Sequence, residues 1–161
     1  MGVMDATTNL TAAAVFAVSS AALYAAHEFG DHWIQTHTQA LTKGGAGWGA
    51  RAACAKHVAT LTVTKLAALL AAFAVTGLPI RPGWWVAAIG VDAASHYWAD
   101  RRSTLRWLAG RVGKGGFFNL GAPREGHGDQ PHLGTGAYAL DQSWHLLWLF
   151  VTALLMAAGA R

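Results

Sequence analysis

The chain has 161 residues, a length that suits one domain. Its residues are 53% apolar and only 12% charged, a balance that is typical of a protein with membrane-spanning segments. A single cysteine, Cys54, excludes an intrachain disulfide framework and a CxxC metal site. The formal net charge of +4 would suit nucleic acid, but the basic residues gather in loops that flank apolar segments. Membrane topology explains that distribution better, so we expect no nucleic-acid partner.

Four apolar segments are long enough to cross a bilayer, since about 20 helical residues span its hydrocarbon core. The expected spans are 10–34, 52–75, 84–102 and 138–158. A long glycine-rich loop at 103–137 joins the last two spans, with a short amphipathic helix expected near its start. The sequence therefore predicts one integral membrane domain over 1–161, an all-α, antiparallel four-helix transmembrane bundle in contact with the lipid bilayer.

Polar side chains recur four residues apart in three of these spans, which places each set on one helical face. The sets are His27, Asp31 and Gln35; Asp92, His96 and Asp100; and Asp141 with His145, while the second span carries His57 and Lys65. In an up-and-down bundle, the end of one span meets the start of the next, so the sets converge at one end. His precedes Asp on the spans that run toward this end, in His27/Asp31 and His96/Asp100, and Asp precedes His on the last span, which runs away from it, in Asp141/His145. This predicts a layer of imidazoles about 6 Å deeper than a layer of carboxylates.

The basic residues indicate the orientation of the bundle. The two loops at the polar end hold most of them: Lys43, Arg51, Lys56, Arg101, Arg102, Arg106, Arg111, Lys114 and Arg124. The opposite end has only Arg81 and Arg161. Because Lys and Arg concentrate in cytoplasmic loops, we expect a multi-pass protein of the cytoplasmic (inner) membrane, with the polar end inside and both termini outside.

The spacing of the polar residues resembles that of a known group of proteins. The motifs are His27-x3-Asp31-x3-Gln35, an isolated His57, His96-x3-Asp100, and Asp141-Gln142-x2-His145. They resemble those of small multi-span membrane proteins of bacteria and their viruses, a family catalogued as a domain of unknown function. The resemblance covers most of the chain and implies a membrane protein, but it brings no established activity.

His and Asp side chains that converge from several helices are what a site for zinc, iron or manganese requires. We expect a divalent metal, with zinc as the first choice and iron or manganese as alternatives. The expected ligands are His27, Asp31, His57, His96, Asp100, Asp141 and His145. Gln35 and Gln142 are expected to orient these ligands through hydrogen bonds, and Lys65 is expected to act as a counter-ion to Asp92.

The favoured activity is that of a metal-dependent hydrolase at the membrane interface. Glu28 and Asp92 are the candidate catalytic carboxylates, and His27-Glu28-x-x-Asp31 resembles the HExxH pattern of metalloproteases with Asp at the second ligand. His127 and His132 in the long loop are candidates for a lid over the site. A lipid, a lipid-linked phosphate or a membrane peptide would be the substrate, because the site faces the membrane surface.

Three other interpretations stay open from the sequence. The His and Asp residues would also serve as a hydrogen-bonded packing network between helices. Buried His, Asp and Lys side chains are likewise the parts of a proton or metal-ion transporter or channel. A non-catalytic membrane interaction protein is the third alternative, and a homo-oligomer is compatible with all of them.

Overall fold

The structure is a computed structural model that describes residues 2–123, 125–126 and 134–160. Every regular element in these residues is helical, which confirms the expected all-α class. In chain order the elements are α1 (Gly2–Phe29), the π-helix η1 (Gly30–Ile34), α2 (His37–Thr42), α3 (Gly47–Thr76), α4 (Pro82–Asp100), α5 (Ser103–Arg111), α6 (Gly115–Phe118) and α7 (Gly136–Ala158).

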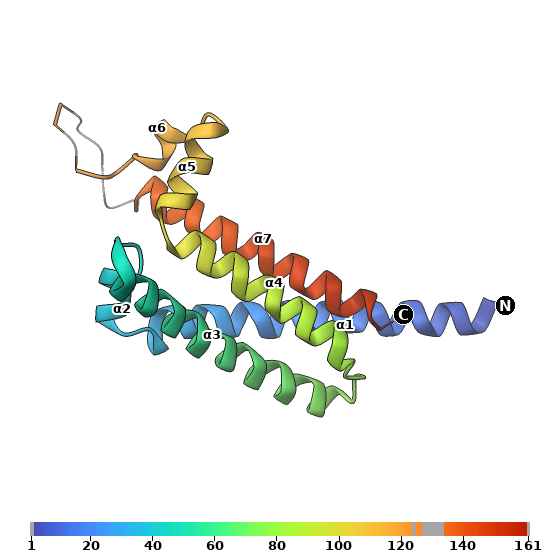
Figure 1. Cartoon of the computed structure of the whole chain (residues 1–161). Coiled ribbons are helices and arrows are strands. Elements are labelled where there is room, and N and C mark those ends of the chain that lie inside the picture. The colour runs from blue at the N-terminus through green and yellow to red at the C-terminus, as the bar shows by residue number, and fades with distance from the viewer. Residues whose placement is uncertain (1, 124, 127–133, 161) are drawn as a thin grey trace.

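Four long helices dominate the arrangement, and each contacts two of the others. Helix α1 packs against α3 and α7, and α4 also packs against both α3 and α7. Successive long helices run in opposite directions (Figure 1). Both ends of the chain and the α3–α4 turn therefore lie toward one end of the molecule, while α2, α5 and α6 lie at the other (Figure 1).

Three of the long helices are long and apolar enough to cross a membrane: Ala6–Ile34, Gly47–Thr76 and Gly136–Ala158. Their outer faces carry exposed apolar side chains, such as Val63 and Val75 of α3, which are 67% and 88% exposed. Helix α4, which corresponds to the expected third span, has 19 residues but is not among the three. Its two carboxylates, Asp92 and Asp100, lower its hydropathy, and both are buried against the other helices.

An apolar core fills the half of the molecule nearer the chain ends. Buried side chains from α1 between Val15 and Leu23, the second half of α3, the first half of α4 and the second half of α7 form one cluster, which includes Leu23, Phe73, Trp85, Leu149 and Met156. Because this half is packed with apolar side chains, the polar residues of the same helices are left to gather in the other half.

The end of the first span departs from a regular helix. The backbone of Gly30–Ile34 forms a π-helix, in which the Gln35 N–H donates to the Gly30 carbonyl at 2.9 Å. Gln35 itself is extended, with φ −60° and ψ 127°. It therefore does not continue the helical face of His27 and Asp31 that the four-residue spacing predicts. A new helix, α2, then begins with a capping box between Thr36 and Gln39.

Candidate metal centre

Each of the four long helices contributes one buried imidazole to the polar half of the molecule. His27 comes from α1, His57 from α3, His96 from α4 and His145 from α7, and none of the four is more than 2% exposed. Two carboxylates meet these rings: Asp31 from η1 and Asp100 from the last turn of α4. Six potential ligand groups from five elements thus lie in one place.

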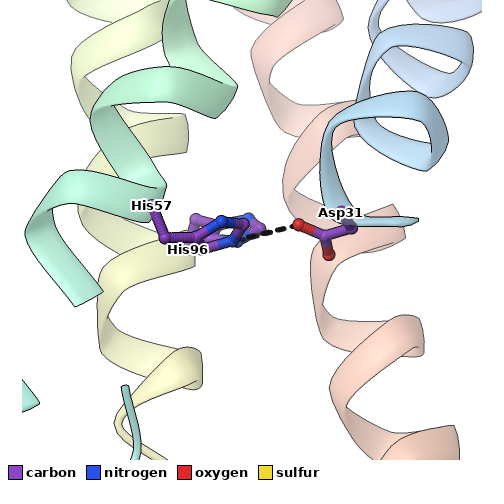
Figure 2. Close-up of side chains that lie close together, drawn as sticks. All are labelled: Asp31, His57 and His96. Atoms are coloured by element: carbon purple, nitrogen blue, oxygen red, sulfur yellow. Dashed lines mark hydrogen bonds and ion pairs between the residues drawn. The ribbon is translucent and has the colours of Figure 1, made fainter. Parts of the chain in front are cut away.

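Asp31, His57 and His96 form the first potential ligand set. The His57 Nε2 atom lies 3.0 Å from Asp31 Oδ1 and 3.1 Å from His96 Nε2. His96 Nε2 is 3.7 Å from the same carboxylate oxygen. Figure 2 shows the two imidazoles side by side, both directed at the Asp31 carboxylate, which approaches from the opposite side on its own helix. Three side chains from three helices therefore point their ligand atoms at a common position.

His96, Asp100 and His145 form a second set that shares one residue with the first. His96 Nε2 is 3.3 Å from Asp100 Oδ2, and His145 Nε2 is 3.9 Å from Asp100 Oδ1. The His96 and His145 rings are stacked with their centroids 4.0 Å apart. His57 Nε2 is also 3.3 Å from Asp100 Oδ2, so the two sets are continuous. This arrangement would suit one ion or two neighbouring ions.

The buried polar atoms of the cluster fit a metal ion. Among the described residues, six atoms of the cluster are buried without a hydrogen-bond partner: His27 Nδ1 and Nε2, Asp31 Oδ1, His57 Nδ1, Asp100 Oδ2 and His145 Nε2. Buried polar groups are otherwise nearly always hydrogen-bonded, because an unmet group in an apolar interior costs about 1–3 kcal/mol. A divalent cation between His145 Nε2 and Asp100 Oδ2, which belong to one ligand set, would satisfy these two atoms. Imidazole with carboxylate is a donor set that zinc, iron and manganese accept.

A cavity of about 500 Å³ opens above the cluster at the polar end. Its floor includes the carboxylates of Asp31, Asp100 and Asp141, while the four imidazoles lie behind them, away from the cavity. The Asp31 and Asp141 carboxylates are thus more exposed than the imidazoles, as the order of His and Asp along the helices predicts, whereas Asp100 is as buried as the rings. A small molecule in the cavity would reach the carboxylate side of the centre first.

Two of the expected ligands lie at the edge of the cluster. His27 is fully buried, but its Nε2 atom is 3.7 Å from Asp31 Oδ2 and belongs to neither ligand set. Asp141 is 25% exposed, and its carboxylate is 3.5 Å from His145 Nε2. The structure therefore brings together His57, His96, Asp31, Asp100 and His145, with His27 and Asp141 beside them.

The two carboxylates expected to be catalytic lie away from the ligand sets. Glu28 is 41% exposed and pairs with His32 at 3.8 Å, outside the lining of the cavity. Asp92 is buried one turn deeper and accepts hydrogen bonds from Lys65 Nζ at 2.9 and 2.7 Å. Lys65 is thus the expected counter-ion of Asp92, which belongs to neither ligand set.

The remaining expected residues line the cavity or lie outside the described residues. Gln35 and Gln142 both line the cavity, as do the three carboxylates. His127 and His132, the candidates for a lid, lie outside the described residues.

Lys43 is a site residue that the sequence did not single out. Its Nζ atom lies 2.8 Å from Asp100 Oδ1, and the residue is 8% exposed. The Arg101 guanidinium donates to the carbonyls of Lys43 and Gly45, so it ties this loop to the end of α4. From the sequence, Lys43 is one of several basic loop residues. The residues around it give no sign that its side chain contacts Asp100.

Comparison of the chain with protein-family models, with curated proteins and with solved structures finds no match. The expected resemblance to the small multi-span bacterial and viral proteins stays a prediction. The geometry of the site is therefore what indicates a function for this chain.

Proposed function

We propose that the chain is a metal-dependent hydrolase embedded in a membrane. The observation that carries the proposal is the convergence of four imidazoles and two carboxylates from five elements beneath a cavity open at one end. Ionisable groups in membrane helices are rare and are retained mainly at functional sites. A cluster of six such groups, five of them with buried atoms that lack a hydrogen-bond partner, favours function over helix packing alone.

In this proposal α4 is a fourth, inner span of an antiparallel bundle. Its buried carboxylates and His96 face the other helices, while the lipid would contact the apolar outer faces of α1, α3 and α7. The basic residues of α5 and of the α2–α3 region favour a cytoplasmic position for the cavity in an inner membrane, with both termini outside. The metal centre would then lie near the level of the lipid headgroups.

The ligand sets indicate which residues of the cluster would bind the metal and which would act as a base. His57, His96, His145, Asp31 and Asp100 would hold the metal, which when bound supplies a polarised water as nucleophile. Asp141 would serve as the general base, because it lines the cavity, is partly exposed and belongs to neither ligand set. Glu28 and Asp92 face elsewhere, so the geometry favours Asp141 as the base.

The position of the apolar core supports a one-sided site over a transport pathway. A path across the molecule would have to continue from the cluster past Lys65 and Asp92 toward the chain ends. Beyond this pair, the interior is filled by the apolar cluster that includes Leu23, Phe73 and Met156. Transporters and channels need polar or hydrated positions through their full depth, whereas here the polar groups concentrate at one end.

A hydrolysis panel tests the proposal on the full chain in detergent micelles. The substrates are a glycerophospholipid, an isoprenoid-linked pyrophosphate and a hydrophobic peptide, with release of phosphate, alcohol or amine as the signal. We expect one class to be hydrolysed, with activity lost in chelator and restored by zinc, iron or manganese.

His96→Gln should lower the rate by about 100-fold or more, because ligands matter at least as much as the groups that orient them. His37→Gln is the matched control, since His37 is exposed on α2. Absence of metal-dependent hydrolysis in all three classes, or equal rates in His96→Gln, would contradict the proposal.

A further inference from the structure

The cavity above the metal centre has a cationic wall as well as a carboxylate floor. Its volume of about 500 Å³ lies within the usual range for small-molecule sites. Lys43, Arg102 and Arg106 line it, from the loop after α2, the start of α5 and the first turn of α5. The Lys43 ammonium is already paired with Asp100, which leaves the two guanidinium groups as the permanent cations of this wall without a carboxylate partner among the described residues.

Both guanidinium groups are positioned by contacts that leave donors unused. Arg102 Nη2 donates to the Ala40 carbonyl at 2.9 Å, and the Arg106 guanidinium lies 5.4 Å from the centre of the Phe118 ring. Among the residues that the structure describes, no carboxylate pairs with either arginine. A guanidinium has five N–H donors, so each keeps several free to bind an anion in the cavity.

The backbone at Arg102 is strained in a way that aims this side chain at α2. Its φ is 54°, and no other described non-glycine residue has a positive φ. The side chain then crosses the loop at Gly44, where a Cβ atom would lie only 2.5 Å from Arg102 Cδ. Such strain persists only where the surrounding structure over-determines it, and it is concentrated at binding and catalytic sites. Arg102 is therefore held over the cavity at a cost to the backbone.

An apolar groove adjoins the cavity along α5 and α7. Leu105 lines both spaces, and the groove of about 140 Å³ continues past Leu108, Val112, Trp144 and Leu147. The side chain of Trp107 on the same amphipathic helix is 58% exposed, a placement typical of residues at the membrane–water interface. A ligand with an anionic head and a hydrocarbon tail would fill both spaces.

We propose that the cavity and groove together bind a phosphate-bearing membrane lipid, the phosphate on Arg102 and Arg106 and one acyl chain between α5 and α7. This inference rests on the proposed function and narrows its substrate class. Guanidinium groups match phosphate oxygens in paired hydrogen bonds, which favours phosphate over a neutral headgroup. The carboxylates of Asp31, Asp100 and Asp141 would repel a phosphate, so binding depends on a cation at the centre between them.

Binding measurements on the full chain in an uncharged detergent test this inference. The probes are dioctanoyl phosphatidic acid, dioctanoylglycerol and inorganic phosphate, titrated into the zinc-loaded protein by calorimetry. We expect phosphatidic acid to bind at least about 10-fold more tightly than either of the others, since each alone lacks one of the two contacts. The Arg102→Gln/Arg106→Gln variant should lose at least about 10-fold in affinity for phosphatidic acid. Arg111→Gln should not, because Arg111 packs on Trp107 outside the cavity.

Zinc content and thermal melting of each variant establish that the fold and the centre are intact. Unchanged affinity in Arg102→Gln/Arg106→Gln would overturn the assignment. If inorganic phosphate bound as tightly as phosphatidic acid, the cavity would be a site for free phosphate. If dioctanoylglycerol bound as tightly, only the apolar groove would contribute. Either result would also overturn the assignment of a phosphate-bearing lipid. Tight lipid binding without hydrolysis would contradict the proposed function and leave the lipid site standing. Metal-dependent hydrolysis of a peptide, without phosphatidic acid binding, would do the reverse.

Discussion

His96 is the side chain on which the whole centre depends. Its Nε2 atom faces His57, Asp31 and Asp100, and its ring stacks on His145. It therefore belongs to both potential ligand sets, whereas each of the other ligands belongs to one. The two carboxylate oxygens of Asp100 have different partners: Oδ1 is paired with the Lys43 ammonium. The remaining oxygen, Oδ2, is the one that faces the imidazoles of His57 and His96.

The choice of catalytic base is tested by a pair of carboxylate substitutions. Asp141→Asn should lower the hydrolysis rate by about 100-fold or more, because general-base catalysis typically contributes 10²–10⁴-fold. The metal content should stay unchanged, since Asp141 lies outside the ligand sets. Glu28→Gln should leave both rate and metal unchanged, because Glu28 faces His32 and not the cavity. A rate loss in Glu28→Gln with full activity in Asp141→Asn would reverse the assignment of the base.

At the scale of elements, the π-helix η1 decides how Asp31 meets the imidazoles. The wider turn ends the ladder of four-residue spacings and presents the carboxylate to α3 and α4, at 3.0 Å from His57 Nε2. Such turns are frequent at functional sites. Close packing of η1 on α3 is possible because residue 30 is glycine: a Cβ there would lie 2.3 Å from Leu61 Cδ1. Leu61 is buried and has little room to move.

Gly30→Ala should therefore weaken the metal centre. The added methyl group must displace the Leu61 side chain or move η1 away from α3, and overpacking of this kind costs about 1–3 kcal/mol. The matched control is Gly90→Ala, an exposed position on α4 where a Cβ atom meets nothing within 4 Å. There the change should be neutral or favourable by up to about 1 kcal/mol. Thermal melting and zinc affinity in detergent measure both effects, and equal behaviour of the two variants would contradict this role of Gly30.

The ion pair between α3 and α4 gives a second prediction about elements. Lys65→Met leaves the buried Asp92 carboxylate unpaired and should destabilise the protein by about 3–5 kcal/mol. Lys65→Met/Asp92→Leu removes both charges and should regain most of that stability, with metal content and hydrolysis unchanged. Unfolding in detergent, beside the hydrolysis rate, provides the readout. A double variant that melts normally but has lost turnover would show that the pair takes part in the reaction.

At the scale of the whole molecule, the convergence of the polar residues was predictable and their local geometry was not. A His or Asp is easily recognised in an otherwise apolar helix. These residues lie late in one span and early in the next, so an antiparallel bundle brings them to the same end however its helices pack. The π-turn at Gly30–Ile34, the return of Lys43 to Asp100 and the strained backbone at Arg102 have no such signature. They depend on contacts between segments far apart in sequence, which composition and periodicity do not encode.

The orientation of the bundle is a prediction about the whole molecule, and cysteine labelling tests it. Cys54 is fully buried, so it should give little background with a membrane-impermeant maleimide. Arg81→Cys at the α3–α4 turn should react in intact cells, whereas Lys114→Cys beside α6 should react only after the inner membrane is made permeable. The basic residues around Lys114 are the reason for this expectation. Labelling of Lys114→Cys but not Arg81→Cys in intact cells would invert the topology.

The metal content of the purified protein decides whether the cluster is a metal centre. The full chain is purified in detergent without chelators, and its metals are quantified by elemental mass spectrometry beside His96→Gln and the control His37→Gln. We predict one or two equivalents of zinc, iron or manganese in the native chain and in His37→Gln, and loss of all of it in His96→Gln. No bound metal in the native chain, even after reloading, or equal metal in His96→Gln, would contradict the account. The imidazoles and carboxylates would then be a packing network.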